Sequence, residues 1–152
     1  MRRGRRVGID VGDVRIGVAV CDPDGLIATP SETVAAGPTA IARLAQIVEE
    51  TGAFECVVGL PVSLSGREGP AAVKVRAFAG ELAAAVAPTE VRLFDERMTT
   101  MTADNLLRQG GRSGRAKRRV IDQAAAAVIL QTALDSERTR GSAPGTSLRE
   151  EP

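Results

Sequence analysis

The residues of this sequence that could do chemistry are acidic, and they lie where strands and helices are expected to begin or end. Asp10 interrupts the apolar segment VGIDVG, Asp95 and Glu96 close the segment EVRLFDE, and Asp122 follows the basic run AKRR. Buried carboxylates are unfavourable unless they are paired or bind a cation. If these acids converge, their oxygen atoms suit a hard divalent ion such as Mg²⁺ or Mn²⁺. Two such ions could promote hydrolysis of a phosphodiester.

Each acid also has a structural interpretation, which the sequence leaves open. Asp10 could form a turn, and Asp95 or Glu96 could pair with Arg97 or cap the helix that follows. Asp122 could be an acid in the first turn of a helix that pairs with the basic residues before it. The set of acids indicates a metal site more strongly than any one of them.

The direction of Asp122 can be predicted from the residues that follow it. The positions four, seven and eleven residues further on are Ala126, Ile129 and Ala133, which form an apolar stripe on a helix. We therefore expect Asp122 to face the sheet, and the small alanines to let the helix lie close to the strands. Gly8 and Gly12, on either side of Asp10, are expected to let a phosphate backbone approach.

The composition excludes several kinds of site. The chain has no histidine, which excludes Ser-His-Asp and Cys-His catalysis. Cys21 and Cys56 are expected to be buried, reduced thiols, and a disulfide between subunits is the alternative. The chain has no Tyr or Trp and only three Phe, which argues against a protein that binds single strands by stacking bases.

The net charge is only +1, but basic residues cluster in the segment 111–119. We expect this segment to be a loop that contacts a nucleic-acid backbone, and a solvated loop without a partner is the alternative. The candidate nucleic-acid-binding residues are Arg112, Arg115, Lys117, Arg118 and Arg119.

The apolar periodicity predicts an α/β protein with a mixed sheet covered by helices. No apolar run is long enough to span a membrane, so we expect a cytoplasmic protein. We expect a single domain over residues 1–136 and a disordered tail over 137–152. The predicted strands cover 5–12, 14–21, 26–30, 54–61 and 90–96, and the predicted helices cover 39–51, 70–87, 99–110 and 120–134.

Four segments, in this order, resemble the YqgF/RuvX family of RuvC-like nucleases, and most of all its actinobacterial members: GIDVGDVRIGVAVCD, VVGLPVSLSG, FDERMTT and DQAAAAVIL. The resemblance implies an RNase H-like fold with a five-stranded mixed sheet. It implies an endonuclease that depends on Mg²⁺ or Mn²⁺ and acts on the 5′ end of pre-16S rRNA, on four-way DNA junctions, or on both. The family pattern places the metal-binding and catalytic acids at Asp10, Glu96 and Asp122.

The same resemblance gives Asp95 a supporting role near the metal. It also suggests that Arg15 and Arg97 contact the phosphate or the ligands, with structural salt bridges as the competing interpretation. A homodimer is expected if the substrate is a junction, because two strands must be cut symmetrically.

Two other functions remain open. The chain could be a nucleic-acid or pre-ribosome binding factor without catalysis, because basic segments bind polyanions without cutting them. It could also be a nucleotide-binding fold of the actin and sugar-kinase type, but such proteins need two of these domains and 152 residues are too few.

Overall fold

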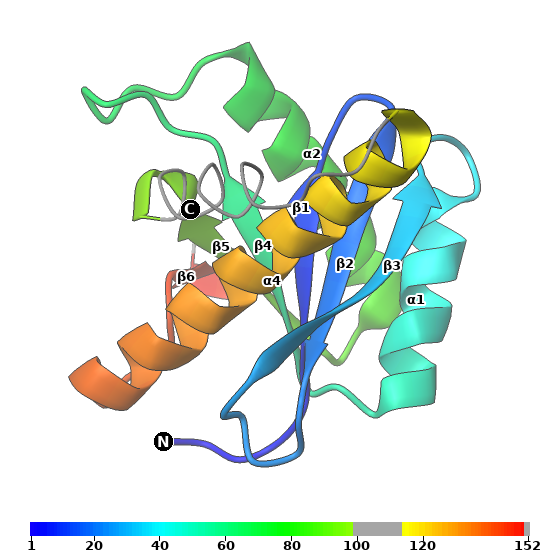
Figure 1. Ribbon diagram of the computed structural model, residues 1–152. Helices are drawn as coiled ribbons and strands as arrows, with labels where there is room; N and C mark the ends of the chain where they lie inside the picture. The colour runs from blue at the N-terminus through cyan, green and yellow to red at the C-terminus, as the bar shows by residue number, and fades with distance from the viewer. Residues whose placement is uncertain (99–113, 151–152) are drawn as a thin grey trace.

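A computed structural model of the chain describes residues 1–98 and 114–150, without the side chains of 114–119 and 150. In this part of the chain, six strands form one mixed sheet in the order β3-β2-β1-β4-β5-β6. Figure 1 shows α4 crossing one face of the sheet, while α1 and α2 cover the other. The predicted α/β class is confirmed. The predicted number of strands is one too low, because a short sixth strand forms near the C-terminus.

The first three strands form an antiparallel meander. β1 (Arg6–Val11) pairs with β2 (Arg15–Cys21), and β2 pairs with β3 (Ala28–Ala35). The third strand was predicted over 26–30 but continues to Ala35, because it pairs with β2 along the whole length of that strand. Its extension escaped the sequence pattern because β3 is a largely exposed edge strand without apolar alternation.

The centre of the sheet is parallel and fully covered. β4 (Glu55–Leu60) lies between β1 and β5 (Glu90–Asp95) and runs parallel to both. All six residues of β4 are buried, as the continuous apolar run predicts. The carboxyl ends of these three strands therefore meet at one edge of the sheet.

Two helices pack against the first face of the sheet. α1 (Ala40–Thr51) ends at Gly52, whose φ of 68° allows its N–H to donate to the carbonyls of Val48 and Glu49. α2 (Pro70–Val86) begins at Pro70, whose fixed φ and missing N–H suit the first position of a helix. Leu44 of α1 and Leu82 of α2 are fully buried beneath these helices.

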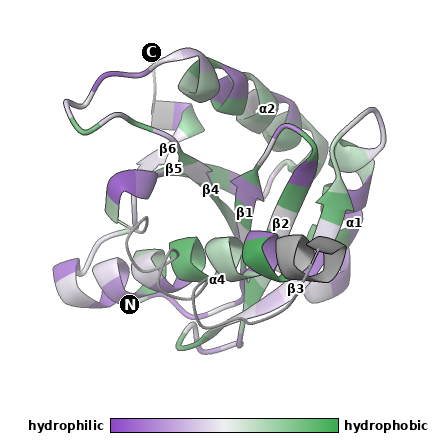
Figure 2. Ribbon diagram, turned by 45° about the horizontal axis from the view of Figure 1, so that its top comes forward, coloured by the Kyte–Doolittle hydropathy of each residue, from purple (hydrophilic) through white to green (hydrophobic). Residues whose placement is uncertain are grey.

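The last helix, α4 (Gly114–Arg140), covers the other face and is longer than predicted. The predicted loop over 111–119 is wrong for 114–119, because Arg, Ala and Lys favour a helix even without an apolar stripe. Asp122 consequently lies in the third turn of the helix instead of the first. In Figure 2, β1, β2 and the middle of α4 are mainly hydrophobic, while the C-terminal end of α4 is hydrophilic.

The apolar stripe of α4 lies where the sequence predicts it. Ala126, Ile129 and Ala133 are each 2% exposed or less, and they form a second core with residues of β2, β4 and β5. The predicted helix over 99–110 lies outside the described residues.

The predicted disordered tail over 137–152 is wrong for residues 137–150. α4 continues to Arg140, and β6 (Thr146–Ser147) then pairs antiparallel with β5. Low hydrophobicity suggested disorder, but a few specific contacts hold this segment instead. One of them is made by Glu137, which is only 2% exposed.

Glu137 belongs to a buried ionic cluster that attaches the end of α4 to the start of the chain. Arg2 donates to both Glu137 and Glu55, and Arg6 donates to Glu137 over 2.8 Å. Burial alone would raise the pKa of Glu137, but the hydrogen bonds and charges of the two arginines outweigh it and lower the pKa. A chain that ended at residue 136 would leave both guanidinium groups without this partner.

Both cysteines are buried, as predicted, and they form no disulfide with each other. Burial raises the pKa of the Cys56 thiol to about 12. Among the described helices, none is long and apolar enough to cross a membrane.

We predict that Glu137→Gln destabilises the protein by about 3–5 kcal/mol, because it leaves buried positive charge uncompensated. Asp135→Asn is the control, since Asp135 pairs with Arg138 at the surface of the same helix and should matter by less than about 1 kcal/mol. Urea unfolding of the two variants measures the difference. Equal midpoints for both variants would show that the buried cluster does not stabilise the fold.

Candidate active site

Asp10 lies near the end of the central strand β1 and points toward α4. Side chains alternate along a strand, so Ile9 enters the core beneath α1 and α2 while Gly8 and Asp10 face the other helix. The partner of Asp10 on β2 is Gly17. The strand thus presents a half-buried carboxylate to the space below the first turns of α4.

Glu96 reaches the same space from β5. It is the first residue of a 3-10 turn (Glu96–Met98) that follows β5 directly. Its side chain crosses Gly59 of β4, where an added Cβ would lie only 2.5 Å from Oε1 of Glu96. The absence of a side chain at Gly59 lets Glu96 form a hydrogen bond with Asp10.

Asp122 is brought in by the close approach of α4 to the sheet. An added Cβ at Gly17 would lie 1.9 Å from the backbone oxygen of Asp122, so only glycine fits under this turn of the helix. The Asp122 carboxylate accepts a hydrogen bond from Nε of Arg15 over 2.8 Å. It is close enough to Asp10 for its charge to raise the pKa of that group.

The three predicted acids therefore converge at one edge of the sheet, from a strand, a 3-10 turn and a helix. Asp95, the neighbour of Glu96, is directed away and accepts hydrogen bonds from the backbone and guanidinium of Arg97. Asp95 and Glu96 are adjacent in the sequence, and the sequence pattern could not distinguish them. The turn after β5 directs their side chains apart.

The electrostatics of the cluster favour a bound proton or a cation. Burial, the Asp10 charge and the hydrogen bond to Asp10 raise the pKa of Glu96 to about 8, with a smaller effect of Asp95. Burial also raises the pKa of Asp10, with the charge of Asp122 adding to it and the hydrogen bond to Glu96 opposing it. At neutral pH, Glu96 therefore keeps its proton and donates it to Asp10.

These residues fit a divalent ion in donor type, since all three offer carboxylate oxygen. The described side chains nevertheless contain no group of three acids or thiols already spaced to hold a metal. Asp122 instead accepts a hydrogen bond from Arg15, and Glu96 shares its proton with Asp10. The Arg15 guanidinium and this proton both supply positive charge that a cation could replace.

The two predicted arginines form ion pairs in this structure. Arg15 pairs with Asp122, and Arg97 pairs with Asp95 while also approaching the backbone oxygen of Leu64 at 3.4 Å. Among the predicted basic residues, Arg112 lies outside the described residues, as do the side chains of Arg115, Lys117, Arg118 and Arg119.

The predicted role of the glycines beside Asp10 is wrong. An added Cβ at Gly8 would lie 2.7 Å from Cβ of Leu130, so α4 covers this position and no phosphate can approach it. An added Cβ at Gly12 would meet the backbone oxygen of Arg15 at 2.5 Å, so this glycine serves the turn. The roles of Gly17 and Gly59 were not predicted, although glycine inside an apolar strand is itself a sign of close approach.

Comparisons with known proteins show the family of the chain. The sequence pattern of the RuvX family, described as a Holliday junction resolvase, matches residues 4–136. A Streptomyces avermitilis protein named "Putative pre-16S rRNA nuclease" is 63% identical over 147 residues, which cover 95% of this chain and 94% of that protein. A Nocardioides protein of the same name is 60% identical over 155 residues and covers 99% of both chains.

The fold is also similar to that of a solved structure. RuvC from T. thermophilus, in complex with a Holliday junction substrate, superposes with a TM-score of 0.59 over 93% of this chain and 99% of that chain. The sequences are only 18% identical, so this likeness concerns the fold. It confirms the predicted RNase H-like architecture.

We predict that Gly17→Ala destabilises the protein by roughly 1–3 kcal/mol, because the new methyl group would displace α4 and Asp122 from the sheet. Gly80→Ala is the control: an added Cβ on this exposed face of α2 meets nothing within 4 Å, and alanine should stabilise the helix by up to about 1 kcal/mol. Thermal unfolding measures both variants. If the Gly17 variant matched the Gly80 variant, the close approach of α4 would be refuted.

The raised pKa of Glu96 predicts a pH dependence of stability in the presence of a chelator. The folded state keeps a proton that the unfolded chain releases, so this stabilisation is complete below the ordinary pKa of a glutamate and is lost as the pH rises through about 8. We expect the unfolding temperature to fall by roughly 3–6 °C between pH 6 and pH 8.5.

Glu96→Gln should remove most of that fall, since glutamine cannot ionise. The control is Glu81→Gln, a change at an exposed acid of α2 that should leave the pH dependence as it is. An identical pH profile in the Glu96 variant and the unchanged protein would contradict the shared proton.

Proposed function

This chain belongs to the RuvX family of nucleases, and we propose that it hydrolyses phosphodiester bonds of structured nucleic acid at Asp10, Glu96 and Asp122. The observation that supports this proposal is the convergence of the three carboxylates at one edge of the sheet. Bringing half-buried acids together is unfavourable for a fold, because burial and the charges of neighbouring acids raise the pKa values of Asp10 and Glu96. Such clusters are typical of sites that bind cations or move protons.

The residues of the cluster would change partners when the site becomes active. Asp10 and Glu96 would release their shared proton and offer two carboxylates, and Arg15 would leave Asp122 free to offer a third. Mg²⁺ or Mn²⁺, when bound there, would neutralise charge on the phosphate and make the attacking water more acidic. Water would attack the phosphorus in line, the bond to the 3′ oxygen would break, and the products would end in a 3′-hydroxyl and a 5′-phosphate.

Arg15 is well placed for a second contact after it leaves Asp122. Its side chain is 34% exposed at the start of β2, so its guanidinium could turn toward a phosphate that approaches the acids. The side chain of Arg97 is 38% exposed and pairs with Asp95 in this structure. In this proposal, both arginines contact the phosphate backbone of the substrate, and Asp95 positions Arg97.

The basic residues at the start of α4 would guide the backbone toward this site. Arg115, Lys117, Arg118 and Arg119 precede Asp122 on one helix, and Arg112 comes just before that helix. Lysine and arginine that neutralise phosphates release counterions, so binding should weaken as salt increases. The substrate would then be recognised through its backbone and shape.

The preferred substrate in this proposal is precursor rRNA near the 5′ end of 16S rRNA, which would place the reaction in the cytoplasm. The support is the shared name of relatives that are 60% identical or more over nearly the whole chain. A four-way DNA junction is the second candidate, supported by the description of the family pattern. A junction would require two copies of the chain, and a precursor RNA requires one.

We predict that Asp10→Asn or Asp122→Asn lowers the cleavage rate at least 100-fold, on the order of what single catalytic groups contribute. Binding should stay within a few-fold, because neither acid contacts the substrate without a cation. The assay incubates labelled precursor rRNA and labelled four-way DNA junctions with Mg²⁺, Mn²⁺ or EDTA, and it measures cleavage and binding separately.

Asp24→Asn is the matched control, because Asp24 is an exposed acid in the β2–β3 turn, far along the sheet from the cluster. It should cleave as the unchanged protein does. Metal-dependent cleavage that persists in both site variants would rule out this site. Binding without cleavage by the unchanged protein would favour the alternative of a non-catalytic binding factor.

A further inference from the structure

We propose that a cavity beside the acidic cluster receives one nucleobase of the substrate strand and stacks it against Phe78. This inference rests on the proposed nuclease function and adds a base-binding subsite to it. It concerns the opposite face of the sheet from α4, at the same edge as the three acids.

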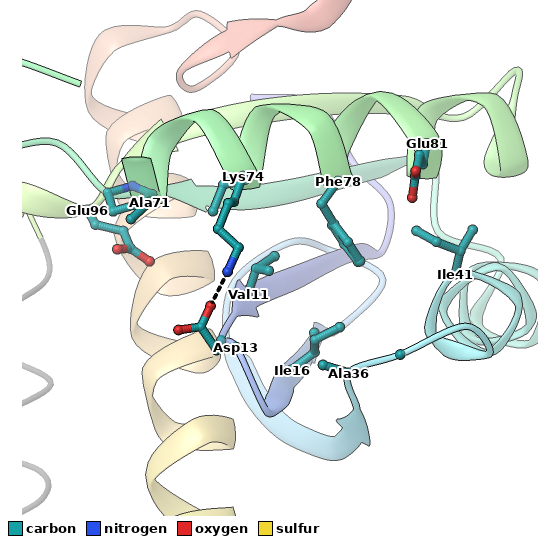
Figure 3. A pocket seen from close by; sticks show the side chains of 14 residues that line it. Val11, Asp13, Ile16, Ala36, Ile41, Ala71, Lys74, Phe78, Glu81 and Glu96 are labelled. Carbon is teal, nitrogen blue, oxygen red and sulfur yellow. Dashed lines mark hydrogen bonds and ion pairs between the residues drawn. The ribbon is translucent and has the colours of Figure 1, made fainter. Parts of the chain in front are cut away.

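The cavity has a volume of about 380 Å³ and lies between the β1–β2 turn, α1 and α2. Figure 3 shows Val11 and Ile16 on the sheet side, Ile41 on the α1 side, and Phe78 projecting from α2. Its volume is within the range of sites that bind small organic groups, and such sites combine apolar walls with a few polar groups. A flat, mostly apolar ring with polar edges matches this chemistry.

Phe78 is the aromatic residue in the chain that is free to stack. The chain has three phenylalanines and neither Tyr nor Trp. Phe94 is only 5% exposed, and the Phe54 ring is covered by the guanidinium groups of Arg2 and Arg6 at 5.0 and 4.7 Å. Phe78 is half-buried and lines the cavity. An aromatic face that meets a cavity next to a phosphodiester site is a stacking surface for a base.

The polar groups of the cavity suit a nucleotide. Lys74 and Asp13 both line the cavity and form an ion pair of 2.7 Å, which Figure 3 shows. Their side chains are 70% and 82% exposed, so the pair contributes little stability and can open easily. Once open, Lys74 could bind a phosphate, while the carboxylates of Asp13 and Glu81 could accept hydrogen bonds from a base.

The cavity and the acidic cluster share one residue, Glu96. Glu96 lines the cavity and also forms the hydrogen bond to Asp10. A base held by Phe78 and a phosphate held at the acids would therefore belong to the same nucleotide or to neighbouring ones. Such a base must leave its stack in the substrate, which is easiest at an unpaired end, a bulge or a junction. The subsite would thus select the place of cleavage.

The test combines protein variants that fill the cavity with substrates that lack a single base. Ala71→Phe places a large side chain in the cavity from the exposed start of α2, and Ala84→Phe places the same group on the exposed surface of that helix outside the cavity. Phe78→Leu keeps apolar volume but removes the ring. The Asp10→Asn change is added to each form, so that binding is measured without cleavage.

The probe is the substrate that the unchanged protein cleaves, synthesised with a single abasic nucleotide at each position near the cut. We expect one abasic position to weaken binding by on the order of 10-fold in the Ala84→Phe form. The Ala71→Phe and Phe78→Leu forms should bind the intact substrate more weakly by a similar factor, and the same abasic position should then have no further effect.

The subsite would be refuted if an abasic position weakened binding equally in all three forms. It would also be refuted if the Ala71→Phe form bound the intact substrate as tightly as the Ala84→Phe form. In either case, continued cleavage by the unchanged protein would leave the proposed function standing. Thermal unfolding within a few degrees of the parent shows that a variant is folded. Phe78→Leu serves if Ala71→Phe fails this check. If the unchanged protein cleaved neither substrate, the proposed function would fail first, and the subsite with it.

Discussion

The close approach of α4 to the sheet decides where the chemistry of this protein can occur. A helix usually stands off from a sheet by the thickness of its side chains. Here Gly8 and Gly17 remove side chains from the facing strands, and alanines do the same on the helix. Asp122 is thereby brought near Asp10, although the two residues are 112 positions apart in the sequence. At the far end of α4, the buried pairing of Glu137 with Arg2 and Arg6 fixes the same helix to the start of β1.

This packing creates an electrostatic conflict that the protein alone resolves only in part. Three half-buried acids repel one another. The proton that Glu96 shares with Asp10 and the Arg15 guanidinium that pairs with Asp122 reduce this repulsion. Both interactions are reversible, since a proton can leave and Arg15 is partly exposed. The site therefore combines a rigid arrangement of backbone with an exchangeable positive charge. We regard this combination as the physical basis of the proposed hydrolysis.

Much of this arrangement could be predicted from the sequence, and the exceptions share a cause. Asp10 on a strand and Asp122 above an apolar stripe follow from periodicities of two and 3.6 residues, which are local. The choice of Glu96 over Asp95 came from family resemblance, because local pattern cannot tell which way a turn after a strand directs its side chains. The ion pair of Arg15 with Asp122 depends on the register of β2 against α4, which no local pattern contains. The tail was misjudged for the same reason: Glu137 is held by residues at the opposite end of the chain.

The most direct test of the central claim is a crystal structure of the protein grown with Mn²⁺, with the ion located by its anomalous scattering. The account predicts anomalous density between the carboxylates of Asp10, Glu96 and Asp122, with the Arg15 guanidinium turned away from Asp122. Density at other residues only, or an unbroken bond from Arg15 to Asp122 beside an Mn²⁺ bound elsewhere, would contradict it.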